Sequence, residues 1–180
     1  GDKVTGVSTM FISEKMDTGP VLLTEEVPVG DNETIGELHD KLAATGAELL
    51  IKTIEQFDML TPVPQDDSQA TYCKKIKKED RELDLNWDWQ KIHNTVRAIG
   101  GFFMDEGKRV VVTRTIIKNP SLRGVIDEAI SLKEIASPRS AARNDGMVTL
   151  SKYLDIYVRP EGKKEMPFAD YLRGRTNNVS

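Results

Sequence analysis

Residues 6–29 read GVSTMFISEKMDTGPVLLTEEVPV, two apolar runs separated by a polar, turn-rich stretch. The period-two pattern of Val7, Thr9 and Phe11 predicts a buried strand over residues 6–13. The rest of the stretch predicts a loop and a second strand, at residues 14–20 and 21–29. This strand-loop-strand arrangement determines how the following residues are interpreted.

A long amphipathic helix is expected next. Thr34 and Glu37 have the spacing of a capping box, which marks a helix start. One face of the helix is expected to be apolar, formed by Leu38, Leu42, Leu49, Ile54 and Phe57. A unit of two strands and one helix is too small to cover both faces of a sheet. We therefore expect it to be the end of a larger α/β domain, and the chain to be a fragment.

The remaining residues predict a different architecture. Asp58–Ser68 contains Pro62 and Pro64 and is typical of a linker. Short strands are expected at residues 70–76, 82–85, 109–117, 124–132, 147–150 and 153–158, a spacing that indicates a small barrel. Two helices are expected, one over residues 88–99 that Gly100 and Gly101 end, and one over residues 166–173 that Gly174 ends.

Composition excludes several classes of protein. The chain has 180 residues, 38% of them hydrophobic, and no apolar run of the ~20 residues that cross a bilayer. The single cysteine, Cys73, excludes an intrachain disulfide. With His39 and His93 as the two histidines, no zinc-like cluster and no metal site is expected, and His93 is expected at the surface or partly packed.

Charge divides the chain. Residues 1–62 carry 4 Lys/Arg against 12 Asp/Glu, whereas residues 63–180 carry 21 against 17. This asymmetry suggests two units with different partners, and a polyanion is a partner that suits the second. A chance difference between the halves of a slightly acidic chain explains the same numbers.

Asp17 is the strongest candidate for chemistry, because a carboxylate at the exit of a buried strand can orient a base or transfer a proton. It stands in Lys15-Met16-Asp17-Thr18-Gly19-Pro20. A simpler interpretation is that its side chain caps backbone amides in a turn. The residues alone leave both interpretations open.

Two motifs resemble known enzymes. Residues 5–10, TGVSTM, followed by residues 16–20, MDTGP, resemble the folate-dependent formyltransferases. Residues 159–166, RPEGKKEM, followed by residues 169–175, ADYLRGR, resemble the C-terminal signature of the methionyl-tRNA formyltransferases. The opening of the second unit, Ala70-Thr71-Tyr72-Cys73-Lys74, is similar to the Thr-Tyr-Ala-x-Lys of that family, with Cys73 in place of Ala. The resemblance covers essentially the whole chain.

The resemblance implies an α/β remnant followed by a β-barrel similar to an OB-fold. Residues 1–57 correspond to the end of a Rossmann-like catalytic domain, residues 58–74 to a linker, and residues 75–180 to a C-terminal tRNA-binding domain. The family carries an Asn-Pro-x-Pro turn where this chain reads Ile99-Gly100-Gly101-Phe102-Phe103, so the turn must be built differently.

The implied activity is transfer of the formyl group of 10-formyltetrahydrofolate to the α-amine of methionyl-initiator tRNA. Of the family's catalytic Asn, His and Asp, only the Asp has a match, Asp17, so the 180-residue chain alone is expected to be inactive. Folate contacts are expected from Ser13, Glu14, Lys15, Met16 and Asp17.

The tRNA is expected to bind a group of basic residues, Lys74, Lys75, Lys77, Lys78, Arg97, Lys108, Arg109, Lys163 and Lys164. The resemblance also implies a monomer without a membrane partner, in the bacterial cytoplasm or in a eukaryotic organelle. Two alternatives stay open: a sugar-nucleotide formyltransferase, and a tRNA-binding module without enzymatic activity.

Overall fold

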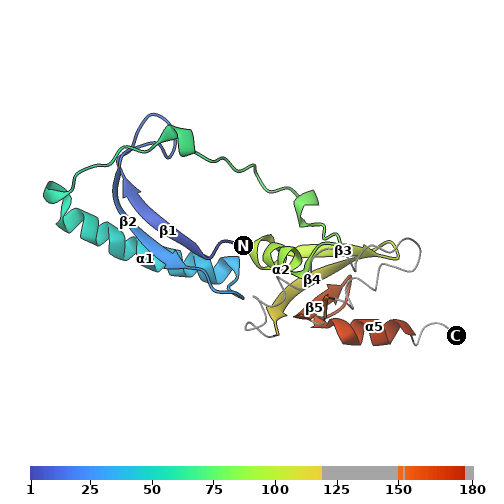
Figure 1. The fold of residues 1–180 in the computed structure, drawn as a ribbon. Helices are drawn as coiled ribbons and strands as arrows, with labels where there is room; N and C mark the ends of the chain where they lie inside the picture. The colour runs from blue at the N-terminus through green and yellow to red at the C-terminus, as the bar shows by residue number, and fades with distance from the viewer. Residues whose placement is uncertain (119–149, 152, 177–180) are drawn as a thin grey trace. The chain divides into compact units, whose positions relative to one another are not determined.

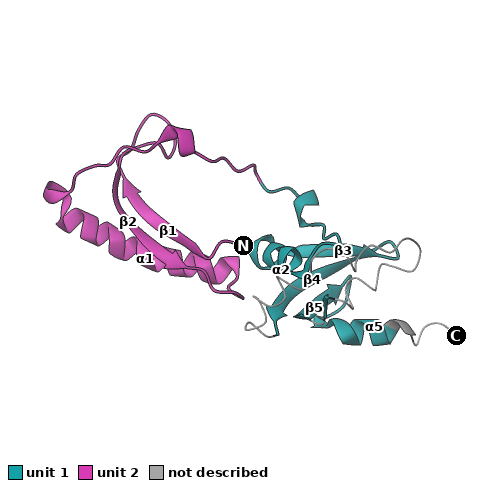
Figure 2. Cartoon of the chain, in the orientation of Figure 1, with its two compact units in different colours: residues 1, 76–180 teal, residues 2–75 magenta. Residues whose placement is uncertain are grey.

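The computed structural model describes residues 1–118, 150–151 and 153–176 of the 180-residue chain. The described residues divide into two compact units (Figure 2), and each is considered by itself. Residues 2–75 form one unit, and residue 1 with residues 76–180 forms the other. None of the described helices is long and apolar enough to cross a membrane.

The unit of residues 2–75 is a hairpin covered by one helix (Figure 1). Strand β1 (Val4–Met10) pairs antiparallel with β2 (Val21–Pro28), with Ser8 opposite Thr24. Helix α1 (Ile35–Glu55) packs along both strands. The predicted strands and helix are therefore confirmed, although the first strand begins earlier and ends before Phe11.

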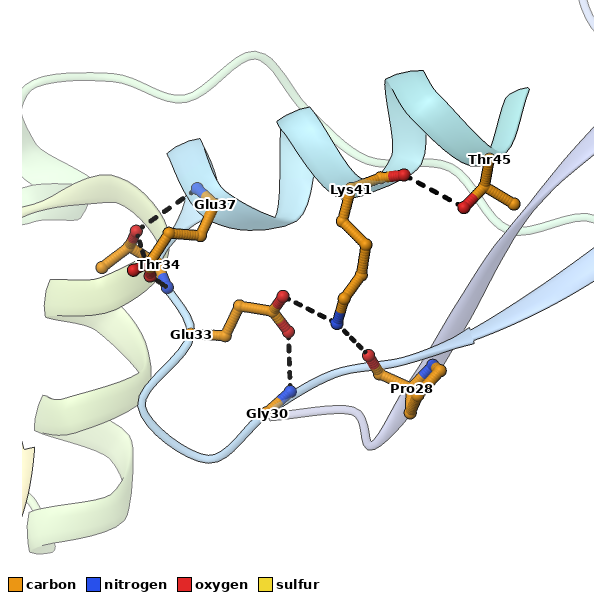
Figure 3. Close-up of polar contacts among 7 residues, drawn as sticks. All are labelled: Pro28, Gly30, Glu33, Thr34, Glu37, Lys41 and Thr45. Atoms are coloured by element: carbon orange, nitrogen blue, oxygen red, sulfur yellow. Dashed lines mark hydrogen bonds and ion pairs between the residues drawn. The ribbon is translucent and has the colours of Figure 1, made fainter. Parts of the chain in front are cut away.

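Helix α1 begins at the predicted capping box (Figure 3). Thr34 N donates to Glu37 Oε2 at 2.8 Å, and Thr34 Oγ1 accepts from Glu37 N at 3.5 Å. Lys41 Nζ lies 2.7 Å from both Glu33 Oε1 and the carbonyl oxygen of Pro28. These contacts join the first turns of α1 to the end of β2.

The apolar face expected on α1 is partly wrong. Leu49 and Thr53 are buried, whereas Ile54 is 66% exposed and Phe57 is 48% exposed. At 100° per residue, Ile54 lies about 140° around the helix axis from Leu49 and points away from the hairpin. Thr53 takes the inward position instead, where its Oγ1 lies 2.9 Å from Thr9 Oγ1.

The segment after α1 returns to the hairpin. Two short 3₁₀ helices, η1 (Phe57–Met59) and η2 (Asp67–Gln69), flank a stretch in which Val63 bridges antiparallel to Val21. Both backbone hydrogen bonds of this bridge measure 2.8 Å. The strand predicted at residues 70–76 does not form.

The unit of residues 76–180, labelled unit 1 in Figure 2 and called the second unit here because it comes second along the chain, contains a four-stranded antiparallel sheet among its described residues. Its strands are ordered β3-β4-β5-β6, where β3 is Gly101–Asp105, β4 is Lys108–Ile117, β5 is Leu154–Pro160 and β6 is Met166–Pro167. A 3₁₀ helix, η3 (Glu79–Arg81), and two helices, α2 (Trp89–Ile99) and α5 (Phe168–Thr176), complete the described part.

Several predictions for this unit need correction. The described residues form a four-stranded antiparallel sheet and show no closed barrel, and the strand expected at 124–132, with all but Leu150 of the one expected at 147–150, lies outside the described residues. In place of the strand expected at residues 82–85, Glu82 makes a single bridge to Phe102. Met166 and Pro167 pair with β5. Proline is tolerated there because β6 is an edge strand of the described sheet, where the missing N–H has no partner strand to bond. The last helix begins at Phe168, and Gly174 lies inside it.

The turn between α2 and β3 replaces the proline turn of the family. Gly100 ends α2 with φ of 72°, a value that favours glycine, and β3 starts at the next residue. Strand β3 was not predicted. It joins β4 through Glu106 and Gly107, both with positive φ, as a two-residue hairpin requires.

This unit has a continuous apolar core. Buried residues from α2, from the sheet and from α5 contact one another, among them Ile92, Val110, Leu154, Val158 and Phe168. His93, expected at the surface or partly packed, is in fact fully buried, at 1% exposed, and its Nδ1 lies 2.8 Å from Thr115 Oγ1. The hydroxyl satisfies a ring nitrogen that burial would otherwise leave without a partner.

Candidate active-site loop and basic sheet edge

The loop between β1 and β2 is closed at its base. Phe11 N donates to the carbonyl oxygen of Pro20 at 3.0 Å. A Cβ at Gly19 would lie 1.7 Å from the oxygen of Phe11, so only glycine allows this approach. The strand ends thus fix where the loop begins and ends.

Hydroxyl groups hold the loop together internally. Ser13 Oγ donates to the oxygen of Lys15 at 2.8 Å and lies 2.7 Å from Thr18 Oγ1. Thr18 Oγ1 also donates to the oxygen of Lys15, at 3.1 Å. Ser13 and Lys15 were both expected to contact folate. The Ser13 hydroxyl and the Lys15 backbone oxygen instead make hydrogen bonds within the loop.

Asp17 sits at the strained point of this loop, with φ of 58°, in the left-handed region that few residues other than glycine adopt. Its side chain is exposed, and in the part of the chain that the structure describes its carboxylate has no hydrogen-bond or ion-pair partner. The turn-capping interpretation assigned amide partners to this carboxylate. The turn is instead held by Ser13 and Thr18, which leaves the carboxylate of Asp17 available to a ligand.

A groove of about 1040 Å³ lies beside Asp17, entirely within residues 2–75. Its walls come from the loop, from β2 and from the segment after α1, and include Met16, Asp17, Leu23, Gln65, Tyr72 and Cys73. Ser13, Glu14 and Lys15 do not line it. A carboxylate beside apolar strand residues is typical of a site for an organic ligand.

Gln65 and Tyr72 were missed as site residues by the sequence analysis. They belong to a stretch that was interpreted as a linker and the start of a barrel, and no periodic pattern marks them. The neighbouring Asp66 has a pKa below its ordinary value, because its carboxylate accepts hydrogen bonds from the side chains of Ser68 and Gln69 and from the amide of Ser68.

The second unit gathers four of the expected basic residues at one end of its sheet. Lys108 and Arg109 begin β4 at the β3–β4 turn, and Lys163 and Lys164 lie between β5 and β6. The register places Val110 opposite Pro160, so both turns are at the same end. Lys108, Lys163 and Lys164 are exposed there.

Two of the expected basic residues, Arg109 and Arg97, are placed less favourably for phosphate. The Arg109 guanidinium lies 4.0 Å from the Phe102 ring centroid, in a hollow shared with Lys78 but also with Glu82 and Glu161. Arg97 is half-buried, and its Nε donates to Asn94 Oδ1 at 3.0 Å. Lys74, Lys75, Lys77 and Lys78 are exposed. The described residues contain no group of three metal-ligating side chains.

Comparison with known proteins identifies relatives for both units. Residues 1–54 match the family model described as formyl transferase. Methionyl-tRNA formyltransferase of Heliobacterium modesticaldum is 35% identical over 97% of this chain and 58% of its own length. The Jannaschia sp. enzyme of the same name is 34% identical over 97% of this chain and 55% of its length. The chain thus spans about half the length of the curated relatives it matches.

Among solved structures, HypX from Aquifex aeolicus in complex with tetrahydrofolic acid aligns over 95% of this chain and 30% of its own. The TM-score is 0.54 at 16% identity, which shows that the two chains share a mixed α/β fold. From residues 1–54 and the identity over nearly the whole length, the chain belongs to the formyltransferase family and is a homologue of the methionyl-tRNA formyltransferases.

Proposed function

We propose that this chain is part of an enzyme that transfers the formyl group of 10-formyltetrahydrofolate to the α-amine of methionyl-initiator tRNA, in the bacterial cytoplasm or an organelle. The observation that carries the proposal is the carboxylate of Asp17. It has no partner among the described residues and lies on a loop held from within, in the segment that matches the family model.

The chemistry suits a carboxylate at this place. An amine that attacks a formyl carbon must lose a proton as the tetrahedral intermediate forms and breaks down. Asp17 either accepts that proton directly or orients the imidazole of the family's catalytic histidine, which then accepts it. When the tetrahedral intermediate breaks down, the bond between the formyl carbon and N10 of the donor breaks, and tetrahydrofolate leaves with N10 protonated. The chain's own contribution is to place the carboxylate.

Residues around Asp17 are suited to a folate ring. Met16 and Asp17 line the groove together with Val21, Leu22 and Leu23 of β2. Apolar walls with a few polar groups bind flat heteroaromatic rings. Ser13, Glu14 and Lys15 would act through the backbone of the same loop, because they lie outside the groove and the Ser13 hydroxyl is used internally.

We use the name basic sheet edge for the four basic residues at the end of the sheet that carries the β3–β4 and β5–β6 turns: Lys108, Arg109, Lys163 and Lys164. We propose that these residues bind tRNA phosphates, and that the exposed lysines at positions 74, 75, 77 and 78 do so too. Lysines bind phosphate without reading sequence, which suits a tRNA backbone. Arg97 should contribute less to phosphate binding, because its guanidinium already donates a hydrogen bond to Asn94. A sugar-nucleotide acceptor would have no use for this edge.

The activity test uses the full-length protein that carries this sequence. Asp17→Asn should lower kcat for formyl transfer to methionyl-tRNA by on the order of 10²–10⁴-fold, through loss of the proton acceptor. Asp40→Asn, an exposed carboxylate on α1, is the matched control and should keep full activity. The 180-residue chain alone should transfer no formyl group. A near-normal kcat for Asp17→Asn, or transfer to a sugar nucleotide instead, would refute the proposal.

The tRNA proposal has its own test. Replacing Lys163 and Lys164 by Ala should reduce the salt dependence of tRNA binding by roughly 1–2 units of log K against log salt. The double substitution should leave kcat at saturating tRNA unchanged, because the lost contacts bind the ground state and the transition state equally. An unchanged slope would show that these lysines only face solvent.

A further inference from the structure

Gln65 reaches the Asp17 loop from the segment after α1. Its Nε2 donates to the backbone oxygen of Asp17 at 2.9 Å and to that of Gly19 at 2.8 Å. The same nitrogen lies 4.0 Å from Met10 Sδ. One side chain therefore bridges the carbonyl oxygens of Asp17 and Gly19, the residues on either side of Thr18.

The chemistry of the contact requires an amide. Both acceptors are carbonyl oxygens, so only the nitrogen end of the side chain can face them, and its two N–H groups supply both donors. A carboxylate of the same shape would place negative charge against two carbonyl oxygens. The contact thus distinguishes glutamine from glutamate at position 65.

Gln65 is itself firmly held. Val63, two residues earlier, forms both 2.8 Å backbone hydrogen bonds with Val21 at the start of β2. Pro62 and Pro64 flank Val63, and each fixes its own φ, which reduces the freedom of the segment. The amide of Gln65 is therefore presented to the loop from an anchored backbone.

We propose that Gln65 is a positioning residue that holds the Asp17 loop in its reactive conformation. The proposal rests on the proposed function for its catalytic consequence, but the clamp on the loop can be tested without it. With φ of 58°, Asp17 occupies a conformation that costs free energy and that surrounding contacts must maintain. A hydrogen bond to its carbonyl oxygen fixes the peptide plane and with it the direction of the side chain.

The first experiment measures amide hydrogen exchange in the full-length protein that carries this sequence. In Gln65→Glu, the Phe11 amide, which donates to Pro20 at the base of the loop, should exchange roughly 10-fold faster or more, because two hydrogen bonds to the loop are lost. Gln56→Glu is the matched control, with the same chemical change at the end of α1, and should leave Phe11 within about twofold. Unchanged exchange in Gln65→Glu would overturn the proposal.

The second experiment measures steady-state kinetics in the full-length protein. Gln65→Glu should lower kcat roughly 10–100-fold and leave KM for methionyl-tRNA within about twofold, because the loop is misplaced while tRNA binding is untouched. The activity of the variant relative to the parent should rise as pH falls, since a protonated carboxyl can donate one of the two hydrogen bonds. A purely structural loss would show no such recovery.

The two experiments separate the possible failures. Faster exchange of Phe11 with normal kcat in an active enzyme would refute the positioning role. Faster exchange in a protein that transfers no formyl group would refute the proposed function and leave the clamp on the loop established.

Discussion

The two units of this chain are stabilised in opposite ways. The described part of residues 76–180 buries a continuous apolar cluster contributed by α2, the sheet and α5. In residues 2–75 only three side chains are buried, those of Val27, Leu49 and Thr53. On α1, the apolar side chains of Leu50, Ile51 and Ile54 are more than half exposed. The candidate catalytic carboxylate is therefore placed by hydrogen bonds and close backbone approach, with little help from an apolar core.

Separating the two units should make this contrast clearest. Expressed alone, residues 76–180 should unfold cooperatively in urea, because the unit carries its own core. Residues 2–75 alone should show no cooperative transition, because too little apolar surface is buried to offset chain entropy. Circular dichroism over a urea titration measures both. A cooperative transition in residues 2–75 would erase the contrast.

The same contrast should appear with single substitutions in the 180-residue chain. Leu154→Ala removes a side chain that is 0% exposed and should lower the free energy of unfolding of its unit by about 2–5 kcal/mol. Leu50→Ala on α1, where the side chain is 52% exposed, should change it by less than about 0.5 kcal/mol. Equal losses in urea denaturation would mean that Leu50 is packed in solution.

A smaller effect should follow from the cap of α1. Thr34→Ala removes the acceptor for Glu37 N and should lower the stability of the helix by about 1 kcal/mol. Thr34→Ser keeps the hydroxyl and should behave like the parent chain. Exchange of the Leu38 amide, which donates to the oxygen of Thr34, reports the first turn directly. Equal exchange in both variants would contradict the importance of the cap.

The smallest effect is a pH dependence of the same turn. Hydrogen bonds from the amide and then the hydroxyl of Thr34 lower the pKa of Glu37 below its ordinary value of 4.5. A lowered pKa contributes stability that is fully present above the unfolded value and is lost as pH falls through the folded one. Protection of the Leu38 amide should therefore decline below about pH 4.5. Glu37→Gln, which can still accept from Thr34, should remove most of this decline.

Local signals in the sequence predicted much of the fold. The capping box at Thr34, the two strands around the loop and the start of α2 at Asp88 were all found where expected, because each depends on residues within one or two turns. Strand β3 was missed, since Gly101 and its neighbours also fit a turn. Ile54 was assigned to the wrong face because a spacing of five residues exceeds one helical turn.

Long-range contacts could not be predicted in the same way. Asp17 was singled out by its place at a strand exit and by the family resemblance; the loop expected there is present, and the catalytic role of Asp17 stays a prediction. Gln65 acts 48 residues away from Asp17, through a single side chain. A contact of this kind leaves no period, cap or composition in the sequence. The turn between α2 and β3 also could not be predicted in detail. Gly100, with φ of 72°, reverses the chain where the family has two prolines.

The bridge between Val63 and Val21 has a consequence for association between chains. A free strand edge carries unpaired amide and carbonyl groups and is a template for edge-to-edge aggregation. At the Val21 end of β2 these groups are already paired, and Pro62 and Pro64 on either side of Val63 have no N–H with which to extend the pairing. A foreign strand therefore cannot begin to add at the edge beside the groove, which keeps the approach to Asp17 clear of misassembled chains.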